Sequence, residues 1–344
     1  MSPTIPISTR RKLFLTGASG VVGRALLKRL PADEVICLTH REPVSTPGVE
    51  TVRGNIRESR LGLAEDVFRA LTSRIGCIVH AAAVTNFSQP AEKITGTNIE
   101  GTRHVLELAQ AAGVPLYFVS TAFVHPIHGL AGTAGPNAYE LSKRRAEEII
   151  RSSGHPATIV RPSVIVGDSR TGEIERYQGF HQILELVLRG RASLLPGAAD
   201  SYIDFIPQDA VADIILGLVR AGVVNRDYWL TAGARAPRLQ HLLNLAVANA
   251  SRLFGRPLAV PRLVKPALLE RFLQPKRLSA QPAATRRAYK QLSHFAKYLS
   301  IVEPLPTSLP SLPYDPDQTF ASNIRYWCAR NGHAEIAAAR VGAA

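Results

Sequence analysis

The chain has 344 residues, of which 46% are hydrophobic and 20% charged, and this composition excludes a disordered, collagen-like or coiled-coil protein. Its formal net charge of +14 favours anionic partners, such as phosphate-bearing small molecules, nucleic acid or anionic lipid. Three widely spaced cysteines argue against a disulfide framework and against a metal site. The first residues lack the apolar run of a signal peptide, and no stretch of about 18 apolar residues follows. We therefore expect a cytoplasmic protein without a transmembrane segment.

Short apolar runs alternate with helical patterns along the first half of the chain. The runs that predict buried strands are 12–16, 35–39, 77–80, 116–120 and 158–160. Helical spacing predicts helices over 21–30, 97–112 and 139–151. This alternation predicts an α/β fold with a Rossmann-type, doubly wound parallel sheet that binds ligands at the carboxyl ends of its strands.

The pattern loosens after about Gly167. Helices predicted over 180–189, 209–221 and 239–254 are separated by loops. We expect an NADP-binding Rossmann domain over 11–170. We expect a smaller, mostly helical substrate lobe over 171–344, with some segments returning to the sheet.

A glycine-rich loop follows the first predicted strand and opens the first predicted helix. It reads Thr16-Gly17-Ala18-Ser19-Gly20-Val21-Val22-Gly23. The glycines permit a tight turn, close backbone approach to a pyrophosphate, and close packing of helix on strand. The helix N-terminus then offers free N–H groups to the anion. The loop therefore predicts a dinucleotide site.

The end of the second predicted strand selects between the two nicotinamide dinucleotides. An acid at this point binds the ribose 2′-hydroxyl of NAD, but the chain has His40 and Arg41 here, and no acid before Glu42. A guanidinium matches a 2′-phosphate in a bidentate way, so Arg41 with His40 predicts NADPH. The alternative is that Arg41 is solvated and Glu42 binds the ribose of NADH.

Three further features predict catalysis on a carbonyl. Thr121 follows the fourth strand after Ser120, Tyr139 and Lys143 form a YxxxK pair, and Arg161 begins an Arg-Pro-Ser end to the next strand. Residues four apart share one helix face, so Lys143 would lower the pKa of the Tyr139 phenol. Tyr139 would exchange a proton with the substrate oxygen, and Thr121 would hydrogen-bond the same oxygen. Lys143 would also hold the nicotinamide ribose.

These motifs resemble those of the extended short-chain dehydrogenases/reductases over about residues 11–235. Other matching segments are Gly54-Asn55-Ile56, His80-Ala81-Ala82-Ala83 and Thr97-Asn98-Ile99-Glu100-Gly101-Thr102. The resemblance implies the catalytic residues Thr121, Tyr139 and Lys143. It also implies a cofactor site made of Gly17, Ser19, Gly20, Val21, Val22, Gly23, His40, Arg41, Asn55, Ile56, Ala81, Ala82, Ala83, Asn98, Tyr139, Lys143, Pro162 and Ser163.

Three segments are most similar to the branch of fatty acyl-CoA reductases and carboxylic acid or thioester reductases. They are 85–87, 161–174 and 203–212. Members of that branch reduce an acyl thioester with NADPH to an aldehyde, or further to the alcohol. The resemblance implies hydride transfer to a thioester carbonyl held by Thr121 and Tyr139, followed by collapse of the hemithioacetal to aldehyde and thiol. The thiol would be coenzyme A or an acyl carrier protein.

The chain departs from the branch at Asn55, where an acid is common, and in a short segment between Thr121 and Tyr139. No adenylation or carrier domain precedes the motifs, so we expect the chain not to activate a free acid by itself. A nucleotide-sugar epimerase/dehydratase and a hydroxysteroid-type alcohol dehydrogenase remain alternatives because they use the same triad. A non-catalytic cofactor sensor is disfavoured because both Tyr139 and Lys143 are present.

A basic segment, residues 251–300, holds 11 Lys or Arg and one acid. Its densest part combines basic and apolar side chains: Arg286, Arg287, Tyr289, Lys290, Leu292, Phe295 and Leu299. Three interpretations stay open: an amphipathic helix on an anionic bilayer, a dock for coenzyme A or an acidic carrier protein, and a solvated face. Nucleic acid is not an expected partner, since no reading module is present.

Overall fold

The computed structural model describes residues 11–44, 46–86, 89–127, 135–177, 179–268, 286 and 295–331. The chain forms two compact units. The first contains Met1–Val124, Pro136–Ser163 and Gln208–Leu230, and the second contains His125–Gly135, Val164–Pro207 and Thr231–Ala344. Within the described ranges, no helix combines the length and the hydropathy needed to cross a membrane.

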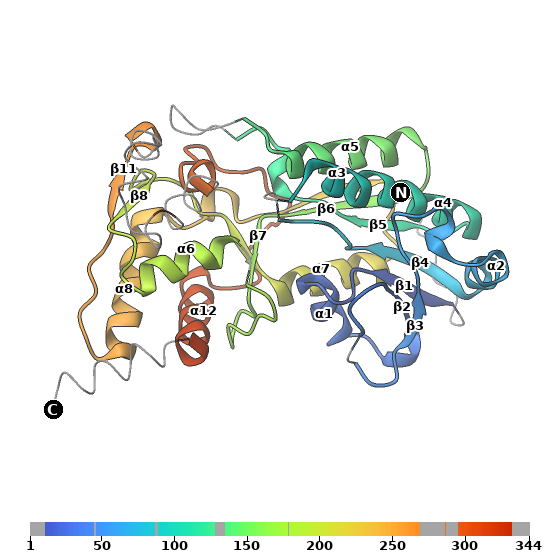
Figure 1. Cartoon of the computed structure of the whole chain (residues 1–344), viewed down its shortest axis with the longest axis horizontal. Helices are drawn as coiled ribbons and strands as arrows, with labels where there is room; N and C mark the ends of the chain where they lie inside the picture. Colours follow the sequence, from blue (N-terminus) through green and yellow to red (C-terminus); the bar gives the residue numbers. More distant parts are fainter. Residues whose placement is uncertain are drawn as a thin grey trace. The chain divides into compact units, whose positions relative to one another are not determined.

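The first unit is built on a seven-stranded parallel sheet with the order β10-β6-β5-β4-β1-β2-β3 (Figure 1). Its strands are β1 (Lys12–Thr16), β2 (Val35–Thr39), β3 (Glu50–Arg53), β4 (Ile75–His80), β5 (Leu116–Val119), β6 (Ala157–Pro162) and β10 (Arg226–Leu230). The strand order reverses between β1 and β4, which is where a doubly wound sheet binds its ligand. The predicted Rossmann-type fold is confirmed.

Helices cover both faces of this sheet (Figure 1). On one face are α1 (Val21–Leu27) and α7 (Gln208–Arg220), and on the other are α2 (Glu65–Arg74), α4 (Gly101–Ala112) and α5 (Ala138–Ser152). Beneath the second group, the apolar core includes Phe14, Ile36, Ile78, Leu116 and Phe118, one side chain or two from each central strand. Burial of this face fixes which side chains the strand ends present to the site.

The boundaries of two helices differ from the predicted ones. The first helix ends at Leu27, and the residues predicted as a helix over 97–112 begin with a π-helical turn, Gly96–Glu100. A short helix, α3 (Ala91–Thr95), precedes that turn, and α4 ends at Gly113, whose φ of +62° is the left-handed conformation that glycine favours. The remaining short helical turns of this unit are Ala32–Glu34, Ser59–Gly62 and Ala122–Val124.

The second unit combines helices with short strand pairs. Among its described residues are the helices α6 (Gly179–Leu188), α8 (Leu239–Phe254) and α12 (Pro316–Asn331), with turns at Gly233–Arg235 and Ala296–Leu299. Strand β7 (Val164–Val166) pairs with β9 (Phe205–Pro207), and β8 (Leu194–Pro196) pairs with β11 (Arg262–Val264). The helices pack around a buried core that includes Phe205, Phe254 and Trp327.

Two apolar members of the basic segment belong to this second core. Leu299 is buried in it, and Phe295 packs against it. They are therefore core residues and not the exposed apolar face of a surface helix. Arg286 is exposed, whereas Arg287, Tyr289, Lys290 and Leu292 lie outside the described residues.

Candidate active site

The glycine loop between β1 and α1 leaves no room for side chains at two of its glycines. A Cβ on Gly17, whose φ is +77°, would lie 2.5 Å from the backbone nitrogen of Ala82. A Cβ on Gly23 would lie 2.2 Å from the carbonyl oxygen of Gly17. Gly20 caps α1 without a side-chain hydrogen bond, and the side chains of Val21 and Val22 are buried. The loop backbone therefore lies directly against the end of β4 and against α1.

The carboxyl end of β4 is fixed by hydrogen bonds to the end of β1. The Ala81 N–H donates to the Thr16 carbonyl at 3.2 Å, and the Ala82 N–H donates to Thr16 Oγ1 at 3.3 Å. His80 Nδ1 lies 2.6 Å from Thr16 Oγ1, and its Nε2 lies 3.2 Å from Thr102 Oγ1. Burial, reinforced by the charge of Lys143, lowers the pKa of His80 to about 3. His80 is thus a neutral packing residue that holds this strand end.

Asn98 joins the segment after β4 to the helix that carries Tyr139. Its Oδ1 accepts from the Val84 N–H at 2.8 Å, and its Nδ2 donates to Ser142 Oγ at 2.9 Å. The residue is buried in the π-helical turn. The side-chain amide of Asn98 therefore links α5 to the backbone of Val84, the residue after Ala83.

Near the end of β2, His40 and Arg41 are both exposed. Neither forms a hydrogen bond or ion pair with any other residue in the described part of the chain. Strand register adds a third basic residue, because Arg53 of β3 lies opposite Thr39. Sequence reasoning missed Arg53, since the weak apolar pattern of β3 gave no strand there.

Asn55 and Ile56, which were predicted to contact the cofactor, contact other parts of the protein: Asn55 bonds within its own loop, and Ile56 packs in the core. Asn55 Nδ2 donates to Glu58 at 2.6 Å, and its Oδ1 accepts from the Arg57 N–H at 3.1 Å. Ile56 is buried in the core of the sheet, at a place where a Cβ on Gly101 would come within 2.9 Å of it. These contacts shape the loop after β3.

The three predicted catalytic side chains converge at the carboxyl end of β5. Thr121 is buried two residues beyond that strand, and its hydroxyl is hydrogen-bonded to the Tyr139 phenol. A capping box between Asn137 and Glu140 begins α5, which puts Tyr139 in its first turn. Lys143 is buried one turn later, with Nζ donating to the Val119 carbonyl at 2.7 Å. Its Nζ also lies 4.4 Å from the centre of the Phe118 ring.

Burial shifts the two ionisable groups of this set in opposite directions. It raises the pKa of Tyr139 to about 12, with the Thr121 hydrogen bond acting in the other direction. It lowers the pKa of Lys143 to about 7, opposed by the charge of Glu147. Here the structure differs from the expected lowering of the tyrosine pKa by Lys143, because loss of water around the phenolate outweighs nearby charge.

The carboxyl end of β6 supplies a polar atom that suits a ligand. Ser163 follows Pro162, and its N–H donates to the Leu230 carbonyl at 3.1 Å. Its side chain is buried, yet its Oγ has no hydrogen-bond partner in the described part of the chain. A buried hydroxyl normally has a partner, so a bound ligand would satisfy it. Together with the glycine loop, this atom fits a nicotinamide dinucleotide.

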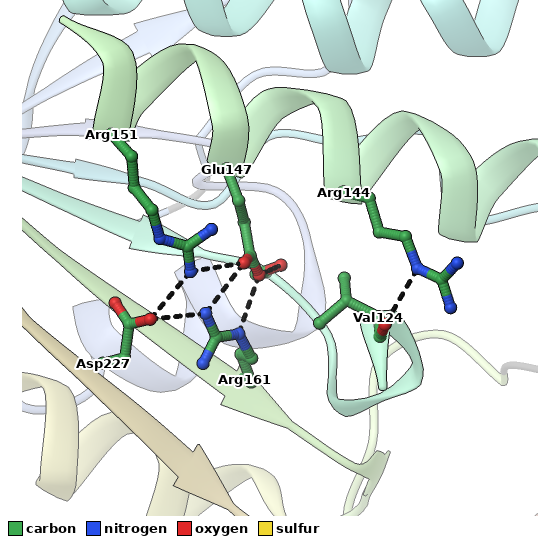
Figure 2. Close-up of polar contacts among 7 residues, drawn as sticks. Val124, Arg144, Glu147, Arg151, Arg161 and Asp227 are labelled. Carbon is green, nitrogen blue, oxygen red and sulfur yellow. Dashed lines mark hydrogen bonds and ion pairs between the residues drawn. The ribbon is translucent and has the colours of Figure 1, made fainter. Parts of the chain in front are cut away.

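A buried network of ion pairs next to Lys143 was not predicted from the sequence. Glu147 on α5 and Arg161 on β6 have only 4% and 5% of their side chains exposed, and Arg161 Nη2 lies 2.8 Å from Glu147. Asp227 on β10 and Arg151 on α5 complete it (Figure 2). The available signal was the spacing of Glu147, one turn after Lys143. Two histidines, His125 and His128, follow Thr121 in the sequence. His125 belongs to the second unit, and His128 lies outside the described residues.

Comparison with known proteins identifies the family of the chain. The profile of the male sterility protein family, whose members have an NAD-binding domain, matches residues 39–215. The chain belongs to this family. Its crystal-structure neighbours include the terminal R domain from the myxalamid PKS-NRPS biosynthetic pathway, with a TM-score of 0.73, 25% identity, and coverage of 96% of this chain and 94% of that one.

Two proteins with similar sequences are synthetases that are much longer than this chain. The hybrid PKS-NRPS synthetase pvhA of Talaromyces variabilis is 30% identical over 64% of this chain. The isonitrile lipopeptide synthase of Streptomyces coeruleorubidus is 31% identical over 61% of this chain. The aligned part of the chain spans only 6% and 17% of those two proteins. The chain is therefore placed among the extended short-chain dehydrogenases/reductases, in the thioester-reductase-like branch.

Proposed function

We propose that this protein reduces an acyl thioester, on coenzyme A or on a carrier protein, with NADPH as the hydride source. The observation that carries the proposal is that Thr121, Tyr139 and the buried Lys143 come together at the carboxyl end of β5. The names of the relatives support the thioester as the substrate class. The relatives include a hybrid PKS-NRPS synthetase and a protein from Emericella nidulans that is named glycine betaine reductase.

When bound, the cofactor supplies a hydride to the carbonyl carbon of the thioester. Tyr139 and Thr121 donate hydrogen bonds to the carbonyl oxygen, and Tyr139 passes its proton to that oxygen as negative charge develops there. The raised pKa of Tyr139 keeps the phenol protonated at neutral pH, as a proton donor requires. The resulting hemithioacetal then collapses to aldehyde and thiol. Lys143 orients the nicotinamide ribose and is the cation nearest to Tyr139 along α5.

We assign the glycine loop, Ala81–Ala83 and Ser163 to the bound dinucleotide, and Arg41 to its 2′-phosphate. The exposed guanidinium of Arg41 supports this assignment, because a phosphate accepts two parallel hydrogen bonds from such a group. We assign selection of the acyl group to the second unit, whose apolar core is distinct from the nucleotide-binding sheet.

The experiment that tests the proposal is NADPH consumption against a substrate panel. The panel contains medium-chain acyl-CoAs, an acylated carrier protein, a simple ketone and a nucleotide-sugar. The proposal expects consumption only with the thioesters, accompanied by release of free thiol. Turnover of the nucleotide-sugar or the ketone without thioester turnover would instead identify an epimerase/dehydratase or an alcohol dehydrogenase.

A further inference from the structure

Glu147 is a buried carboxylate that accepts hydrogen bonds from three directions. Ser120 Oγ donates to it at 2.5 Å. Arg161 donates from Nε at 2.9 Å and from Nη2 at 2.8 Å, and Arg151 Nη2 donates at 2.9 Å (Figure 2). Asp227 accepts from both arginines, so two carboxylates balance two guanidinium groups. Burying a charged group is costly unless it is paired and hydrogen-bonded, and this network meets both conditions.

The network lies directly beside the proposed catalytic residues. Glu147 is one helical turn from Lys143 on α5, and Ser120 is the residue before Thr121. The end of β5 is held at three points, because the Ser120 N–H donates to the Val160 carbonyl at 2.8 Å, Ser120 Oγ donates to Glu147, and Lys143 donates to the residue before Ser120. A displacement of Glu147 would therefore shift Ser120, and with it the adjoining residue Thr121.

We propose that Glu147 is a positioning residue of the active site, which fixes Thr121 through Ser120 and stabilises the ammonium of Lys143 by its negative charge. The inference rests on the proposed function, because it acts through that triad. If Glu147 served only to hold α5 against the sheet, it would need no contact with the residue before Thr121. The direct contact with the residue preceding Thr121 and the spacing to Lys143 point to the reaction.

The groups around Lys143 determine the sign of the pH effect. On α5, Tyr139 lies one turn before it and Glu147 one turn after it. Phe118 and the Val119 carbonyl contact it from β5, and the buried His80 on β4 interacts with its charge. Tyr139 and His80 are uncharged near neutrality, so Glu147 is the charged group that opposes the effect of burial. Lys143, with a pKa of about 7, loses its charge as the pH rises. Removal of the Glu147 charge moves that loss to lower pH.

Two substitutions at this position separate charge from shape. Glu147→Gln keeps the shape and removes the charge, so kcat should fall about tenfold at neutral pH, and its alkaline decline should begin about one pH unit lower. Glu147→Asp keeps the charge, so its decline should stay near that of the unchanged protein although kcat falls. The matched control is Glu148→Gln, one residue along, which alters an exposed pair with Arg145 and should change neither quantity.

Ser120→Ala tests the second contact, and it also serves if Glu147→Gln fails to fold. It removes the hydroxyl while leaving the Glu147 charge, so kcat should fall several-fold with an unchanged pH profile. A readout independent of turnover is the NMR titration of the Lys143 Cε signal, assigned with Lys143→Met. A Lys143 titration that is the same with and without the Glu147 charge, together with full activity in Ser120→Ala, overturns the inference. Lack of any thioester turnover in the unchanged protein contradicts the proposed function instead.

Discussion

Burial has the largest influence on the pKa values of the two ionisable side chains of the proposed triad. Tyr139 stays a phenol because its pKa is raised to about 12, and Lys143 sits near its midpoint because its pKa is lowered to about 7. The phenol begins the reductive direction protonated and ends it by giving up that proton to the substrate oxygen. Lys143 loses charge as the pH rises, so we expect kcat for reduction to decline on the alkaline side of neutrality.

Replacement of Tyr139 by Phe removes the proposed proton donor and leaves the ring. We expect kcat for thioester reduction to fall by about 10²-fold or more, with cofactor affinity and the unfolding temperature preserved. Steady-state kinetics measures kcat and the dependence on cofactor concentration, and dye-free thermal unfolding measures the unfolding temperature. Tyr228→Phe, on the partly exposed face of β10, is the matched control and should behave like the unchanged protein. Near-normal turnover in Tyr139→Phe would remove this residue from the mechanism.

Replacement of Arg41 by Ala tests the proposed cofactor preference. NADPH should bind about tenfold or more weakly, because it loses a charge-assisted hydrogen bond to its 2′-phosphate, while NADH affinity should change little. Fluorescence titration of both cofactors measures this. Arg69→Ala, an exposed arginine paired with Glu65 on α2, controls for the loss of one positive charge. Equal losses for both cofactors, or a native preference for NADH, would contradict the assignment.

Elements whose sequence pattern reflects burial were predicted closely, and those at the edges of the sheet were not. The ranges of β1 and β2 match the predicted runs, since both strands are buried almost throughout. Strands β3 and β10, at the two edges, are half-exposed and have no continuous apolar run. The π-helical turn before α4 has the same apolar spacing as a helix, so its different hydrogen bonding was not predictable.

The same limit applies to the candidate site. The glycine loop and the triad are visible because their residue types and spacing are tied to the chemistry. The Glu147 network was not predicted, because its partners come from three elements and their meeting depends on strand register. Arg161 on β6 and Asp227 on β10 become neighbours only once these strands pair.

The close packing of α1 against the glycine loop leads to a prediction about Gly23. Gly23→Ala puts a methyl group 2.2 Å from a backbone oxygen, so the loop has to shift. We expect at least about tenfold weaker cofactor binding and a lower free energy of unfolding. Gly217→Ala is the control, because Gly217 lies in α7 with nothing within 4 Å of the new Cβ. It should leave cofactor binding unchanged and stabilise the protein by up to about 1 kcal/mol. Unaltered cofactor affinity in Gly23→Ala would contradict the proposed role of the loop.

For the whole molecule, the excess positive charge is concentrated in the basic segment, 251–300, whose net charge is +10. Coenzyme A and carrier proteins are both anionic, so the segment is a candidate dock for the acylated substrate. Neutralising Arg286, Arg287 and Lys290 together should raise KM for an acyl-CoA several-fold and leave kcat unchanged. The effect should shrink as salt rises, because the Debye length is about 8 Å at physiological ionic strength.

A control variant neutralises three exposed arginines of the first unit, Arg69, Arg103 and Arg145. It loses the same charge and should keep KM unchanged. A short uncharged aldehyde, assayed alongside, should be reduced with the same KM by all three proteins. If KM for the acyl-CoA is also unchanged at low salt, and vesicles do not bind the unchanged protein, the basic segment is a solvated face.

The fate of the transferred hydride tests the central claim most directly. The protein is incubated with a medium-chain acyl thioester and NADPH that carries deuterium at both C4 positions, and the products are analysed by mass spectrometry. We predict an aldehyde with one deuterium on its carbonyl carbon, formed together with one equivalent of free thiol, or the corresponding alcohol with two deuteriums. An unlabelled product, or cofactor oxidation without thiol release, would contradict the account.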